Sequence, residues 1–113
     1  TNLTGVNLTQ TILTAAILSS KEVSPVNLTG VNLSGENLNR ESLTNANLSG
    51  ADLSDADLTK ADLSGANLTG AYLNYANLGY ANLTGADLTN ANLTDAIFCG
   101  TTMPDGSTNN SDC

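Results

Sequence analysis

The chain has 113 residues, the size of a single domain, and carries three Lys or Arg against eleven Asp or Glu, a net charge of −8. This acidic balance argues against binding to a nucleic-acid backbone, which needs basic side chains. No apolar run approaches the ~20 residues that a membrane-spanning helix requires. The chain begins at Thr1 without a Met or a signal-peptide pattern, so we expect a mature or trimmed form.

A repeat of five residues runs through most of the chain. Pentads follow one another without a break from Ala46 to Leu93. Each has a leucine at its centre and Ala two before it, usually with Asn or Asp one before and Ser or Thr one after. Counted in steps of five from Leu3 to Met103, twenty-one centres are apolar and eighteen of them are Leu. The register therefore holds along almost the whole chain.

A five-residue spacing fits neither regular element. On an α-helix, steps of five advance by ~500°, so the leucines would drift around the helix axis. On a flat strand, odd steps place successive leucines on opposite faces. A coil that turns a corner after every pentad keeps each leucine pointing inward. The repeat therefore predicts such a coil with a leucine core.

On this pattern the chain resembles the pentapeptide-repeat family over about 100 residues. The resemblance implies an all-β, right-handed quadrilateral β-helix (a pentapeptide-repeat solenoid) with four pentads per coil, and hence about five coils in this chain. Centres twenty residues apart, such as Leu48, Leu68 and Leu88, would then stack on one another. Ala would also point inward, Asn and Asp would face water, and Ser and Thr could hydrogen-bond to the backbone at the corners.

The position two after each centre is expected at a corner. Eight of the ten glycines occur there, which suits a corner with positive φ. Lys60, Tyr75 and Tyr80 occupy the same position. The sequence therefore argues that positive φ is not obligatory at the corners.

The N-terminal part follows the pattern less closely. Residues 11–18 fit either a regular coil or a short helix with one apolar face, and the register on both sides favours the coil. Residues 21–25 form the weakest pentad and are expected to contain a bulge or loop. Lys21, Glu36 and Glu41 occupy the inward position of Ala. We expect such charges to be paired, or displaced outward by local irregularity.

The sequence predicts a β-helix over residues 1–98 and a capping tail over residues 99–113. Pro104-Asp105-Gly106 is a turn signal, and the residues after it are polar. This tail is similar to those that close exported pentapeptide-repeat proteins of cyanobacteria and chloroplast thylakoid lumens. Phe98 is larger than any earlier centre and is expected to close the top of the core.

Cys99 and Cys113 are the two cysteines of the chain, and they allow a metal or redox site or a structural disulfide. Zinc usually takes four ligands, and the chain offers neither a His nor a third Cys, so the sequence favours the disulfide. A disulfide implies an oxidising compartment. Together with the resemblance of the tail, it implies a thylakoid lumen or a periplasm. We expect the tail, fixed in this way, to keep its end of the rod monomeric.

Tyr72, Tyr75 and Tyr80 lie in adjacent pentads and are expected to face outward. Tyr80 shares a column with Lys60 and Arg40, which allows a cation–π contact. These residues form a candidate partner-binding patch, because aromatic side chains are enriched at interfaces. The alternative, to which the sequence gives more weight, is cross-strand stacking that stiffens the rod.

The carboxylates do not form an obvious catalytic or metal site. Asp52, Asp57 and Asp62 recur every five residues, so they lie on successive sides of the coil and cannot converge on one ion. The sequence also contains no nucleophile–base pair, phosphate loop or cofactor motif. We therefore expect no enzyme, no metal and no cofactor.

The leading hypothesis is an exported, non-enzymatic structural or protein-interaction module. It would be a monomer with an unidentified protein partner, and it would bind no nucleic acid. The alternative is a DNA mimic that inhibits a type II topoisomerase, as some pentapeptide-repeat proteins do. A net charge of −8 fits that alternative, whereas the short chain and its cysteine-bearing tail argue against it.

Overall fold

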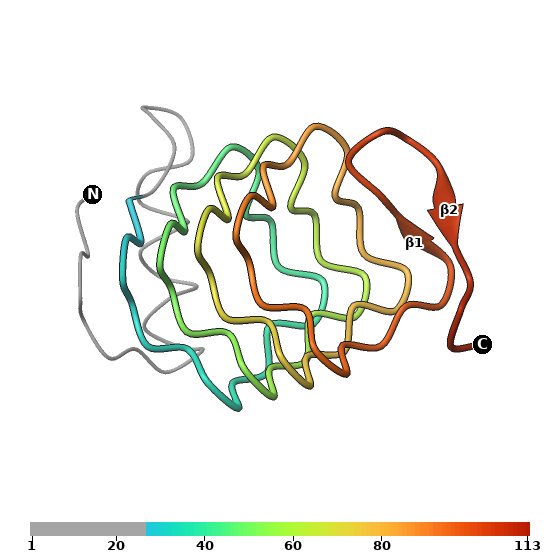
Figure 1. Ribbon diagram of the computed structural model, residues 1–113, viewed down its shortest axis with the longest axis horizontal. Helices are drawn as coiled ribbons and strands as arrows, with labels where there is room; N and C mark the ends of the chain where they lie inside the picture. The colour runs from blue at the N-terminus through green and yellow to red at the C-terminus, as the bar shows by residue number, and fades with distance from the viewer. Residues whose placement is uncertain (1–26) are drawn as a thin grey trace.

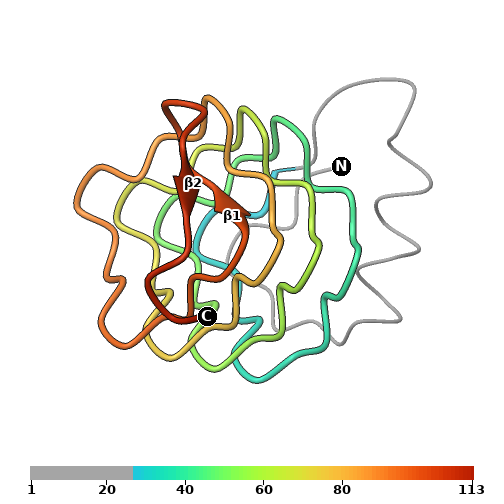
Figure 2. The same cartoon turned by 90° about the vertical axis from the view of Figure 1, so that its right-hand side faces the viewer.

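The computed structural model describes residues 27–113. In this range the chain winds into stacked coils, seen side-on in Figure 1 and after a 90° turn in Figure 2. The expectations for residues 11–25 and for Lys21 lie outside the described residues. The count of about five coils includes that part of the sequence, so it stays a prediction.

Each coil takes twenty residues. Parallel bridges pair the residue before a centre with the residue twenty positions later, from Asn27↔Asn47 to Asn82↔Thr102. Because a corner follows every pentad, each coil has four sides, which we number by their centres. The first side holds Leu28, Leu48, Leu68 and Leu88; the second Leu33, Leu53, Leu73 and Leu93; the third Leu38, Leu58, Leu78 and Phe98; the fourth Leu43, Leu63, Leu83 and Met103.

The interior is filled by the centres and by the alanines two before them. Every centre from Leu28 to Leu83 is at most 1% exposed, which confirms the stacked leucine ladder. Burial of each such side chain contributes roughly 1.5–3 kcal/mol. The centres of the last coil are only partly buried, because no further coil covers them: Leu88, Leu93, Phe98 and Met103.

Glu36 and Glu41 take the inward position without disturbing the coil. Their carbonyls accept the ladder hydrogen bonds from Asp57 N at 3.0 Å and Asp62 N at 2.9 Å, as alanines do elsewhere. The side chains are half-buried, whereas alanines at this position, such as Ala46, are fully buried. The backbone is therefore regular at both residues, and the expected pairing of these charges stays a prediction.

Every described corner has the same backbone conformation. In the turn from Leu48 to Ala51, Ala51 N donates to Leu48 O at 3.0 Å, and Gly50 between them has φ +66°. A single positive φ at the third residue is the pattern of a type II turn. The non-glycine corners share it, including Lys60 at 62°, Tyr75 at 64° and Tyr80 at 58°.

The prediction that these corners do not require positive φ was therefore wrong. The ladder above and below fixes the turn, so the residue must adopt the left-handed region whatever its side chain. A non-glycine residue there costs roughly 1–2 kcal/mol of backbone strain.

The polar residues on either side of each centre secure the corner from outside. The Asp62 Oδ1 atom accepts a hydrogen bond from Ser64 N at 3.0 Å and another from the Ser64 hydroxyl at 2.7 Å. Asp87 and Thr89 are arranged in the same way. The hydroxyl therefore donates to the side-chain oxygen of the residue before the centre. The sequence had instead suggested a bond to the corner backbone.

The tail folds back on the last coil as a short antiparallel pair. Strand β1 (Thr101–Thr102) pairs with β2 (Thr108–Asn109), in the register Thr101↔Asn109 and Thr102↔Thr108. The reversal between them follows the expected turn signal, with Gly106 N donating to Met103 O at 2.9 Å. Both views place β2 beyond the last coil, at the end of the stack (Figures 1 and 2). Within residues 27–113, no helix is long and apolar enough to cross a membrane.

Candidate interaction surface

The three tyrosines are the most exposed large apolar side chains of the described chain. Tyr72 lies on the second side, Tyr75 at the corner between the second and third sides, and Tyr80 at the corner between the third and fourth. Their exposed fractions are 52%, 57% and 61%. The corner turn explains the last two, because its third residue projects from the coil.

The fourth exposed apolar residue is Ile97, which is 42% exposed. It lies on the third side and pairs in the parallel ladder with Asn77, one coil earlier. The corners on either side of Asn77 carry Tyr75 and Tyr80. Sequence reasoning missed it, although an apolar residue in the Asn or Asp position was the available signal. We call Tyr72, Tyr75, Tyr80 and Ile97 the tyrosine surface.

The coil that bears the tyrosines carries no charge. Residues 66–85 contain no Asp, Glu, Lys or Arg. The coil before them, residues 46–65, contains several Asp residues as well as Lys60. The aromatic side chains therefore stand on an uncharged polar band of an otherwise acidic molecule. Such an exposed, uncharged aromatic surface has the composition of the centre of a protein interface.

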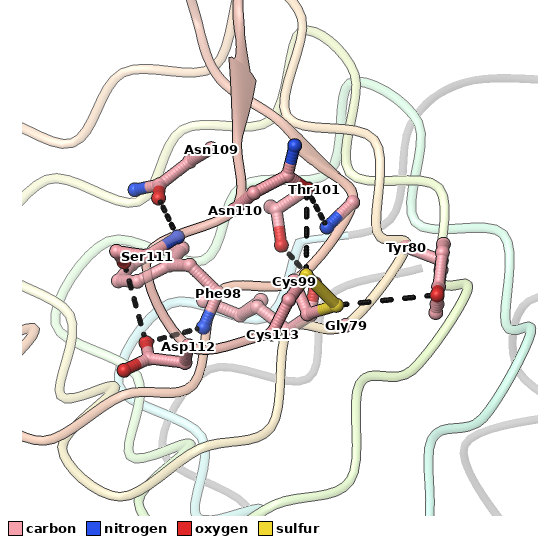
Figure 3. Close-up of a disulfide and its surroundings, with 12 residues drawn as sticks. Gly79, Tyr80, Phe98, Cys99, Thr101, Asn109, Asn110, Ser111, Asp112 and Cys113 are labelled. Atoms are coloured by element: carbon pink, nitrogen blue, oxygen red, sulfur yellow. Dashed lines mark hydrogen bonds between the residues drawn. A yellow bond between two sulfur atoms is a disulfide. The ribbon is translucent and has the colours of Figure 1, made fainter.

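Tyr80 packs against the end of the rod. Its ring lies over Gly100, one coil further along, so closely that a Cβ built on Gly100 would come 2.5 Å from the ring. Its hydroxyl lies 3.9 Å from the Cys99 Sγ atom, as Figure 3 shows. The ring thus lies toward the coil after its own, whereas Lys60 belongs to the coil before it. The cation–π contact with Lys60 and Arg40 stays a prediction.

Cys99 and Cys113 form the expected disulfide, with their Cα atoms 4.8 Å apart. Next to it, the Asp112 carboxylate accepts a hydrogen bond from Phe98 N at 2.9 Å, and the Asn110 side-chain oxygen accepts one from Gly100 N at 2.7 Å (Figure 3). The tail therefore supplies acceptors to backbone N–H groups that a further coil would otherwise have paired.

Three of the acidic side chains accept hydrogen bonds that support the turns of the fold. Hydrogen bonds from the Ser64, Thr89 and Ser107 hydroxyls lower the pKa of Asp62, Asp87 and Asp105, respectively. A carboxyl with a lowered pKa stays ionised at neutral pH and is a poor general acid or base there. Among residues 27–113, no three His, Cys, Asp or Glu side chains are grouped so that they could hold a metal ion.

Comparison with known proteins identifies the repeat. The family described as pentapeptide repeats matches residues 27–65 and 66–103, with eight copies. Among curated protein sequences, none matches this chain closely enough to count as a relative.

Solved structures of pentapeptide-repeat proteins are similar to this chain. HetL of the cyanobacterium Nostoc, involved in heterocyst differentiation regulation, is 49% identical over 75% of this chain and 41% of its own, with a TM-score of 0.47. QnrB1, a plasmid-mediated fluoroquinolone resistance protein, is 29% identical over 69% of this chain and 37% of its own, with a TM-score of 0.62. A protein from the Arabidopsis thaliana thylakoid lumen is 30% identical over 83% of this chain and 69% of its own, with a TM-score of 0.39.

The chain spans less than half the length of the first two of these proteins. The family match nevertheless covers most of the described residues, and the twenty-residue coil agrees with it. The chain therefore belongs to the pentapeptide-repeat family and has its fold, the right-handed quadrilateral β-helix.

Proposed function

We propose that this protein is a non-enzymatic protein-interaction module that works in an oxidising compartment, a thylakoid lumen or a periplasm. The observation that carries the proposal is the tyrosine surface, where three aromatic side chains more than half exposed stand on an uncharged coil. Burying them in a partner would remove a large apolar area from water. The rod, about five coils by the sequence count, would serve as a rigid support for this surface.

The compartment is inferred from the disulfide between Cys99 and Cys113. Disulfides persist in exported proteins and are rare where glutathione and thioredoxin keep thiols reduced. We propose a monomer with one protein partner.

The experiment is affinity capture from lumenal or periplasmic extract with a matched pair of triple variants. The test variant is Tyr72→Asn, Tyr75→Asn and Tyr80→Asn, because the repeat itself uses Asn at both pentad positions that these tyrosines occupy. The control changes the same three positions one coil earlier: Asp52→Asn, Asp55→Asn and Lys60→Asn. A specific partner should be captured by the wild type and the control and lost with the test variant. Equal capture by all three proteins would contradict the assignment of this surface.

A second candidate function is inhibition of a type II topoisomerase by DNA mimicry. The likeness to QnrB1, with a TM-score of 0.62, and the net charge of −8 favour it. The uncharged coil of residues 66–85 argues against it, because a mimic of the phosphate backbone needs charge along its length. A gyrase supercoiling assay at micromolar protein separates the two functions, since only the mimic should inhibit.

A further inference from the structure

The tail closes only half of the outer edge of the last coil. On the third and fourth sides, Phe98 N, Gly100 N and Met103 N donate hydrogen bonds to the tail. On the first and second sides, the backbone N–H groups at the corresponding pentad positions donate no hydrogen bond within residues 27–113. They belong to Leu88, Asn90, Leu93 and Asp95.

The coil below shows what these groups lack. Each N–H at the same position one coil earlier donates to a carbonyl of the last coil, as in Leu68 N to Asp87 O at 2.8 Å and Leu73 N to Asn92 O at 2.8 Å. The carbonyls of Ala86 and Ala91, which a further coil would also pair, accept no hydrogen bond within the described chain. Residues 86–95 therefore carry an unfilled row of ladder donors and acceptors, which we call the open edge.

The open edge also exposes part of the core. Leu88, Ala91 and Leu93 are only partly buried, although their counterparts one coil earlier are completely enclosed. An unpaired strand edge beside exposed apolar side chains is a template for an added strand.

The tail itself indicates the form of occupant that this end accepts. Strand β2 lies in extended conformation against β1, and its neighbour Asn110 offers a side-chain oxygen to the edge. The Pro104-Asp105-Gly106 turn directs the tail over the third and fourth sides, so its own residues do not reach the first and second. The vacant half is thus a place for another extended segment beside β2.

The negative charge at this end of the rod favours a basic occupant. Residues 66–113 contain four acids and no Lys or Arg: Asp87, Asp95, Asp105 and Asp112. This end attracts a basic segment and repels a second copy of the same end. The tail also lies beyond the last coil, so the flat end of another rod cannot meet the open edge flush (Figure 1).

We propose that the open edge binds a basic segment of a partner protein as an added β-strand, which bends at the Asn90 corner as the coil itself does. Carbonyls of the segment accept hydrogen bonds from the N–H groups of the open edge, and its apolar side chains cover Leu88 and Leu93. Its Lys or Arg side chains lie beside Asp87 and Asp95. This site is separate from the tyrosine surface and does not depend on it.

The direct test is amide hydrogen exchange followed by NMR. The probe is a pool of 12-residue peptides in which Lys or Arg alternates with Val, Ile or Leu. The proposal expects a pool member to slow exchange at the Leu88, Asn90, Leu93 and Asp95 amides by tenfold or more. If no peptide of the pool slows exchange at these amides at 100 μM, the proposal is overturned. Slow exchange of these amides without peptide, together with a doubled mass in solution, also overturns it, because a second copy then occupies the edge.

A matched pair of double variants tests the charge. Asp87→Asn with Asp95→Asn keeps residues that the repeat uses at both positions, and Asp57→Asn with Asp55→Asn makes the same change away from the edge. At low salt, the first pair should weaken binding of the selected peptide about tenfold, and the second pair should leave it within twofold. Equal weakening by both pairs overturns the site. The triple tyrosine variant should bind the peptide normally, so failure here is distinguishable from failure of the tyrosine surface.

Discussion

The ring of Tyr80 lies so close to Gly100 that a Cβ added there would come 2.5 Å from its Cδ1 and Cε1 atoms. Gly100 also has φ +64°. Gly100→Ala should therefore destabilise the protein through both backbone strain and the clash. Gly70→Ala is the matched control, since Gly70 has φ +66° and nothing within 4 Å of the added Cβ. It should cost only the strain, roughly 1–2 kcal/mol in urea titration.

A double-mutant cycle separates the two causes. Tyr80→Asn removes the ring and keeps a residue that tolerates the corner conformation. In the Tyr80→Asn background, Gly100→Ala should cost about as much as Gly70→Ala does in the wild type. An undiminished cost in that background would show that the ring is not responsible.

The sequence predicts the interior of this protein better than its corners. A leucine every five residues restricts the chain to one geometry, and the leucine ladder is as expected. The corner conformation was predicted wrongly because Lys60, Tyr75 and Tyr80 were read by their intrinsic preferences. In the folded coil, hydrogen bonds to neighbouring coils fix the turn, and that cooperative constraint is not visible in one pentad.

The surfaces were predictable only in part. Exposure of the tyrosines follows from their places in the pentad, and the disulfide follows from the two cysteines of the tail. The path of Tyr80 toward Gly100 and the half-open last coil depend on how the tail folds back. That path is set by contacts such as Asp112 with Phe98, fourteen residues apart, which no local pattern specifies.

Truncation of a central leucine should be far more costly than truncation at the edge. Leu68 is completely buried between two coils, so Leu68→Ala should cost ~2–5 kcal/mol through lost burial and a cavity. Leu93 is only partly buried in the last coil, and Leu93→Ala should cost clearly less. Denaturant titration measures both, and a loss under ~1 kcal/mol at Leu68 would contradict the ladder.

Stability should fall in acid partly because of Asp62. The Ser64 hydroxyl lowers the pKa of this carboxyl in the folded state. Its contribution is therefore present above the unfolded pKa of about 4 and is lost as pH falls through the lower folded value. Asp62→Asn keeps the acceptor oxygen and removes the titration. Between pH 5 and pH 2, the free energy of unfolding should fall less for the variant than for the wild type. Parallel curves would contradict the link.

The final prediction concerns the disulfide that holds the tail. Cys99 and Cys113 are fourteen residues apart, and closing such a loop contributes ~3 kcal/mol, largely by restricting the unfolded chain. Non-reducing mass spectrometry should find no free thiol. Reduction should lower the melting temperature, and Cys113→Ser should do the same without a reductant.

Reduction should also release the tail from the third and fourth sides. The amides of Phe98 and Gly100 would then lose their acceptors and exchange faster, while the amide of Leu68, inside the ladder, should be unaffected. With the whole outer edge open, we expect concentration-dependent self-association, detectable by sedimentation. The control is Cys99→Ser with Cys113→Ser, on which a reductant should have no effect. Unchanged exchange at Phe98 and Gly100 after reduction would show that hydrogen bonds alone hold the tail.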